Sequence, residues 1–123
     1  MQWLVHEVTK EAADALERHG HKVHRLEEAA MEGPATPENI LRLADQKQWD
    51  VLTGDDVLAH LPFSLAMPFS RSIVYLQLPG GEVEQDDAID RLFLRYKRLT
   101  PRRLYTVTET RVKIRQLPRA AMS

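Results

Sequence analysis

Three groups of residues could carry chemistry in this sequence. Asp55 and Asp56 close the stretch "DVLTGDD", His6 and Glu7 follow the apolar start "QWLV", and Glu38 comes directly after a proline. Adjacent carboxylates repel each other, so they need solvent, a helix N-terminus, a basic partner or a metal ion nearby. Carboxylate oxygens are the preferred ligands of Mg²⁺, and Mn²⁺ accepts the same set. The pattern predicts a Mg²⁺ or Mn²⁺ site.

Each of these acids also has a structural explanation. Asp55 or Asp56 could cap the helix that follows, because aspartate is a preferred N-cap residue. Glu38 falls in a helical first turn, where the helix dipole favours negative charge. The argument for a metal site therefore depends on whether the acids converge.

Alternating strand and helix patterns run along most of the chain. Thr36 and Pro37 give the clearest helix start, as N-cap and first helical residue. Strands are expected at Gln2–Glu7, His21–Leu26, 50–54, Ser72–Leu78, Leu104–Thr108 and Arg111–Gln116, and helices at 8–20, 36–48, 55–61 and 82–99. This order predicts one α/β domain over residues 1–123, three-layered, with a mostly parallel central sheet and a C-terminal antiparallel hairpin.

Parallel strands gather ligands beyond their carboxyl ends. In the expected sheet, His6 ends the first strand and Asp55 and Asp56 end the third, while Glu38 opens the helix between them. The same edge of the sheet should therefore hold all of these side chains, and two metal ions there would activate water for attack on a phosphodiester.

The charge of the chain is unevenly distributed. Residues 1–90 contain seven Lys or Arg against seventeen Asp or Glu, whereas residues 91–123 contain ten bases and the single acid Glu109. A basic end of this kind binds phosphates or faces the acidic part of its own fold, and the scattered distribution favours the second.

Cysteine is absent, which excludes disulfides and thiolate metal sites. The N-terminal apolar stretch is too short for a signal peptide or a membrane span. A cytoplasmic protein without a membrane partner is expected.

Other patterns are weaker. His21 and His24 of "HGHKVH" should point to opposite faces of a strand, which argues against a shared metal. The segment Leu61–Phe69 contains two prolines and is expected to be a loop; it could be a dimer interface, a lid or ordinary loop packing, of which the last is favoured.

The whole pattern resembles a small bacterial PIN-like domain of the type associated with toxin–antitoxin genes. The resemblance covers nearly the whole chain and rests on the order of elements and on "HGHKVHRL", "TPENILRLADQKQWDVLTGDD", "SIVYLQLPG" and "TVTETRVKIR". It implies a nuclease fold with a divalent metal in a hydrolase site, where Asp55 and Glu38 hold the ion and His6 or Asp56 completes the set.

The sequence departs from that family at two positions. The family typically ends its first strand in Asp-Glu-Asn, where this chain has His6-Glu7-Val8, and Val57 stands in place of a second aspartate after Asp55. Strand alternation predicts that Glu7 cannot replace His6, because the two should face opposite sides. Imidazole suits Mn²⁺ better than Mg²⁺, and a ligand set reduced to Glu38, Asp55 and His6 or Asp56 is expected to bind divalent ions weakly.

Two functions follow from this resemblance. The first is a metal-dependent, toxin-like endoribonuclease with Asp55, Glu38, His6 and Asp56 as catalytic residues and RNA as substrate. Its phosphate contacts would come from Arg95, Arg98, Arg102 and Arg103. The alternative is a catalytically inactive binding module of the same fold. An antitoxin protein and a second copy of the chain are the expected partners, and a small-molecule binder at the same edge is a third option.

Overall fold

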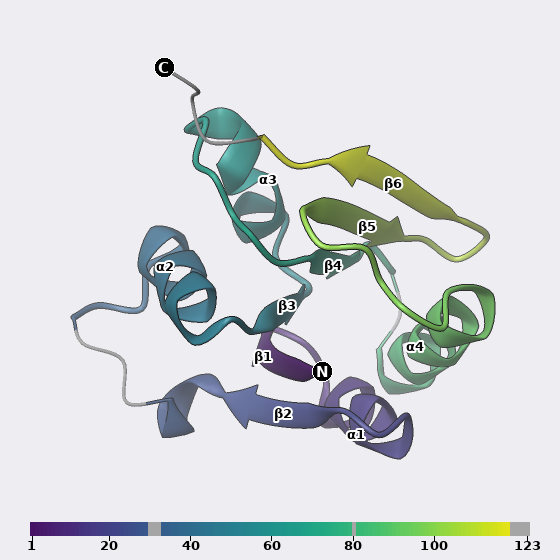
Figure 1. Ribbon diagram of the computed structural model, residues 1–123. Helices are drawn as coiled ribbons and strands as arrows, with labels where there is room; N and C mark the ends of the chain where they lie inside the picture. The colour runs from purple at the N-terminus through teal and green to yellow at the C-terminus, as the bar shows by residue number, and fades with distance from the viewer. Residues whose placement is uncertain (30–32, 80, 119–123) are drawn as a thin grey trace.

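The computed structural model describes residues 1–29, 33–79 and 81–118. Six strands form one sheet in the order β2-β1-β3-β4-β5-β6, and the first five run parallel (Figure 1). They are β1 Gln2–His6, β2 Lys22–Arg25, β3 Asp50–Thr53, β4 Ile73–Leu76, β5 Arg103–Val107 and β6 Val112–Gln116. Only β6 is antiparallel, paired with β5. The expected α/β class, mostly parallel sheet and terminal hairpin are confirmed.

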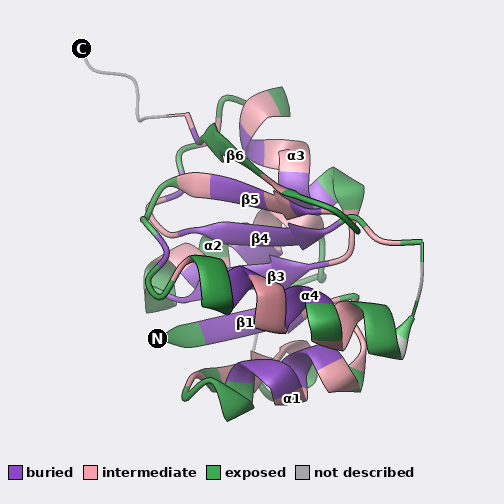
Figure 2. Ribbon diagram, turned by 90° about the vertical axis from the view of Figure 1, so that its right-hand side faces the viewer, coloured by how far each residue is buried: buried purple, intermediate pink, exposed green. Residues whose placement is uncertain are grey.

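Helices cover both faces of the sheet. They are α1 Lys10–Arg18, α2 Pro37–Lys47, α3 Asp56–Ser64 and α4 Glu82–Arg95. In Figures 1 and 2, α1 and α4 lie on one face, and α2 and α3 lie on the other. Each face has its own buried cluster, one around Trp3, Leu16 and Leu92, the other around Leu4 and Leu41. The fold is therefore three-layered, as expected.

The helix starts follow from their capping residues. The hydroxyls of Thr9 and Thr36 accept hydrogen bonds from the backbone N–H groups of Ala12 and Asn39, both at 3.2 Å. Each bond satisfies one of the unpaired donors of a first turn. The predicted cap and proline start of α2 are thus confirmed.

The region after β3 differs from expectation. Helix α3 continues through Pro62 to Ser64, so the loop expected from Leu61 is wrong for its first four residues. Pro62 lacks the N–H that would donate to the carbonyl of Leu58, and it is buried in the last turn of α3. Phe69 is also buried there, which shows that the segment contributes to the core. A short 3-10 helix, η1 Leu26–Glu28, follows β2, and residues 30–32 lie outside the described part.

His21 and His24 lie on opposite faces of the sheet, as predicted. The His21 ring is 4.8 Å from the Phe93 ring, between α1 and α4, whereas His24 stacks on Trp49 at 3.8 Å. Aromatic packing, rather than a shared metal, accounts for both residues.

His21 makes the fold sensitive to pH. Burial, then the N-terminal amine and His19, lower the pKa of His21, and its Nδ1 has no hydrogen-bond partner among the described residues. Since the unfolded chain takes up the proton more readily, stability is full above about 6.5 and falls as the pH drops below that value. The pKa of His24 is lowered too, mainly by burial, and adds to the effect.

We expect the urea concentration at the midpoint of unfolding to decrease when the pH is lowered from 7 to 5. This decrease should be smaller in the His21→Phe variant. The phenyl ring keeps the packing against Phe93 without the titration. An equal fall in both proteins would show that His21 does not contribute.

No helix in the described ranges is long and apolar enough to cross a membrane.

Candidate functional site

The direction in which successive strands are added to the sheet reverses between β1 and β3. Strand β2 lies on one side of β1, and the later strands follow on the other side, with His6 in register with Thr53. In doubly wound folds a crevice forms at this point, outside the carboxyl ends of the two strands. The residues that follow β1 and β3 are therefore placed where such folds bind ligands.

The backbone turns sharply at the end of β1. Glu7 has a φ of 50°, in the left-handed region that non-glycine residues rarely adopt. The strand ends at His6, so the alternation of side chains stops there. The prediction that Glu7 and His6 face opposite sides is wrong for this reason, because it assumed an extended Glu7.

The loop after β3 passes very close to this turn. The N–H of Gly54 donates to the carbonyl oxygen of His6 at 3.1 Å. A Cβ at position 54 would lie 2.4 Å from the backbone oxygen of Glu7. Only glycine fits such an approach, and it brings Asp55 next to His6 and Glu7.

Three side chains converge at this point. His6, Glu7 and Asp55 each offer one ligand atom, and these atoms all lie within 4.8 Å of one another. His6 and Asp55 are half-buried and Glu7 is exposed, so the group is open to solvent on one side. Imidazole nitrogen with two carboxylates suits Mn²⁺ and other transition cations better than Mg²⁺.

The side chain of Thr53 contacts two members of the group, His6 and Asp55. Its buried hydroxyl oxygen lies 3.1 Å from His6 Nδ1 and accepts a hydrogen bond of 3.0 Å from the N–H of Asp55. With Nδ1 engaged, Nε2 is the nitrogen available to a cation. Nδ1 would then donate its proton to Thr53, an arrangement that orients metal-binding imidazoles in general.

Asp55 has a structural role as well. Its two carboxylate oxygens accept hydrogen bonds from the N–H groups of Val57 at 3.1 Å and Leu58 at 3.3 Å, so it is the N-cap of α3. Each carboxylate oxygen has a second lone pair, which leaves room for a cation. The capping explanation and the metal explanation are therefore compatible.

Glu38 and Asp56, two of the predicted ligands, are not part of the convergent group. Glu38 accepts a hydrogen bond of 2.5 Å from Arg42, one helical turn on. Asp56 is largely exposed, and its carboxylate lies 3.0 Å from Nδ1 of His60. The ring of His60 stands edge-on to Tyr75, whose pKa is raised by burial and then by Asp56 and Asp55. His60 thus has partners that the sequence did not reveal.

The four arginines predicted to bind RNA lie at the opposite end of the sheet. Arg95 ends α4 and Arg103 begins β5, while the N–H of Arg102 donates to Arg71 before β4. Thr106, three residues beyond Arg103, is level with His6 across the sheet. Three residues of strand span about 10 Å, and the three strand spacings from β1 to β5 add roughly 14 Å. The structure therefore does not bring the arginines and the convergent group together.

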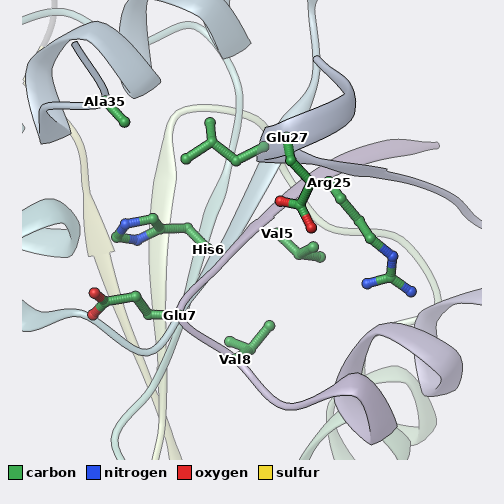
Figure 3. A pocket seen from close by; sticks show the side chains of 8 residues that line it. Val5, His6, Glu7, Val8, Arg25, Glu27 and Ala35 are labelled. Carbon is green, nitrogen blue, oxygen red and sulfur yellow. The ribbon is translucent and has the colours of Figure 1, made fainter. Parts of the chain in front are cut away.

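A hollow of about 380 Å³ lies beside the convergent group (Figure 3). His6 and Glu7 lie on one side of it, and Arg25 lies on the other with Val5 and Val8 between them. Glu27 and Ala35 also line the hollow. Arg25 was not among the predicted site residues, although its position at the end of β2 is a signal for the same edge.

Replacing Glu7 with glycine should separate stability from cation binding. Glycine adopts a φ of 50° without the cost of about 1–2 kcal/mol that a side chain incurs. We expect Glu7→Gly to be as stable as the natural protein, or up to about 1 kcal/mol more stable in urea unfolding, because the added freedom of the unfolded chain offsets part of the gain. Mn²⁺ affinity should fall in the same variant; an unchanged affinity would remove Glu7 from the ligand set.

The fold and the site define a class: a doubly wound α/β domain with a histidine–carboxylate group at its switch point. Comparisons of the chain with protein-family models, with curated proteins and with solved structures found no match.

Proposed function

We propose that this domain is a PIN-like protein that binds one divalent transition cation through His6, Glu7 and Asp55 and uses it to hydrolyse RNA. One observation carries the proposal: the ligand atoms of these residues lie within 4.8 Å of one another at the carboxyl ends of β1 and β3. The sequence resemblance to PIN-like domains supplies the reaction class.

A cation held there would activate a water molecule and neutralise charge on a phosphate. His6 Nε2 and one oxygen each from Glu7 and Asp55 would hold it. Three protein ligands leave further positions for water and a phosphate oxygen. Thr53 keeps the imidazole oriented, and the α3 N-terminus adds a favourable dipole for the anionic substrate.

The second candidate is a PIN-like binding module without catalysis. It is supported by the distance of Arg95, Arg98, Arg102 and Arg103 from the convergent group and by the capping role of Asp55. In that case the acids would be retained for folding, and the arginines would serve an unrelated surface.

Metal binding and cleavage can be measured on the same samples. We expect Mn²⁺, followed by electron paramagnetic resonance, to bind one equivalent in the natural protein, and Glu7→Gln to weaken this binding about 10-fold or more. A fluorescent single-stranded RNA should be cleaved only with Mn²⁺. Glu38→Gln is the matched control, because Glu38 pairs with Arg42 outside the group.

The two candidates predict different results. Mn²⁺-dependent cleavage that Glu7→Gln reduces and Glu38→Gln does not would support the nuclease. Stoichiometric Mn²⁺ binding without cleavage would support the binding module. An absence of Mn²⁺ binding would contradict both the cation site and the nuclease.

A further inference from the structure

Strand β6 is an open edge of the sheet, as Figures 1 and 2 show. Backbone hydrogen bonds from Thr108 to Arg111 and from Leu117 to Arg102, both 2.9 Å, flank its pairing with β5. Because antiparallel pairs alternate, Lys113 and Arg115 direct their backbone groups toward β5. The N–H and C=O groups of Val112, Ile114 and Gln116 point outward instead, and no hydrogen bond within the described ranges reaches them.

The two faces of this edge differ in chemistry. Lys113 and Arg115 lie on the face of α2 and α3, because Arg115 is in register with Leu104 of that buried cluster. Neither forms an ion pair with another described residue, although the Arg115 guanidinium lies 3.7 Å from the Phe63 ring centre. Ile114 lies on the other face and is 40% exposed. The edge thus has bases on one face and an apolar side chain on the other.

We propose that β6 binds an extended segment of a partner protein in which acidic and apolar residues alternate. Such a segment would add a seventh strand through the outward backbone groups of Val112, Ile114 and Gln116. Its acids would lie beside Lys113 and Arg115, since oppositely charged neighbours across strands attract each other. Its apolar residues would cover Ile114 on the other face.

Charge complementarity argues against a second copy as the occupant. A β6–β6 pair would place Lys113 and Arg115 of one copy beside the same residues of the other, and like charges across strands are destabilising. The other open edge, β2, carries Lys22 and Arg25 and is also basic. Basic residues on edge strands can instead serve only to prevent aggregation, which predicts no binding at all.

Hydrogen exchange of the full chain tests the proposal. The probe is a seven-residue, capped peptide of alternating glutamate and valine, and the matched control peptide has lysine in place of glutamate. We expect the glutamate peptide to slow exchange at least 10-fold at the N–H groups of Val112, Ile114 and Gln116. The N–H groups of Lys113 and Arg115 already bond to β5 and should change little, so the expected pattern is alternating.

Charge reversal provides the second measurement. The double variant with Lys113→Glu and Arg115→Glu should bind the glutamate peptide at least 10-fold more weakly and should gain affinity for the lysine peptide. Circular dichroism would check that the variant is folded. The proposal is overturned if no alternating protection appears, if both peptides bind the natural protein equally, or if the chain dimerises through β6 instead.

Discussion

Asp55→Asn should fold normally and bind Mn²⁺ on the order of 100-fold more weakly than the natural protein. Asparagine caps helices as well as aspartate does, and its one side-chain oxygen can accept a hydrogen bond from the N–H of Val57 or of Leu58. The amide has no charge and offers a cation one neutral oxygen in place of a carboxylate. Losing a direct ligand should cost at least as much as losing an outer partner, which typically costs 10–100-fold.

Asp55→Ala is the informative comparison, because it removes the cap as well as the ligand. We expect this variant to lose about 0.5–2 kcal/mol of unfolding free energy in addition to its cation affinity. Urea unfolding and Mn²⁺ titration of both variants give the two quantities separately. If Asp55→Asn kept full Mn²⁺ affinity, Asp55 would be a helix cap and nothing more.

The regular elements were predictable because their signals are local. Thr36 and Pro37 mark the start of α2 by capping chemistry that involves a few neighbouring residues only. Short strands bounded by turns gave the α/β order, and from that order the shared edge of His6 and Asp55 followed. The register of His6 with Thr53 agrees with that expectation.

The composition of the site could not be derived in the same way. Glu7 joins His6 because its backbone leaves the strand at a φ of 50°, and the Gly54 loop lies directly against this turn. Glu38 lies one helical turn from Arg42, and a local ion pair competes with any distant ligand role. Tertiary approach of two loops thus selected which acids converge.

The separation of the arginines from the convergent group also depended on the topology of the sheet. Arg95 and Arg103 are close in sequence and basic, which is enough to suggest phosphate binding. The end of the sheet at which these arginines lie follows only from the direction of α4, which runs back along the parallel strands. Helix C-termini gather at that amino end, where basic residues are favoured by the helix dipole in any case. For Arg95, in the last turn of α4, a structural reason therefore exists without RNA.

Gly54→Ala should have the largest effect on stability, about 2–3 kcal/mol of unfolding free energy. The new methyl group would lie 2.4 Å from the Glu7 carbonyl oxygen, and that neighbour is backbone that cannot rotate away. Either the β3–α3 loop or the end of β1 must move. Both hold the cation group, so Mn²⁺ affinity should fall together with the urea midpoint.

Gly20→Ala is the control that separates a loss of stability from a loss of Mn²⁺ affinity. Gly20 has a φ of 86° and no atom within 4 Å of an added Cβ, so alanine there is strained but meets no neighbour. We expect a loss of roughly 1–2 kcal/mol with unchanged Mn²⁺ affinity, because Gly20 lies between α1 and β2 at the other end of the sheet. If Gly54→Ala lowered stability but bound Mn²⁺ normally, the close packing of Gly54 against Glu7 would not be what positions the cation group.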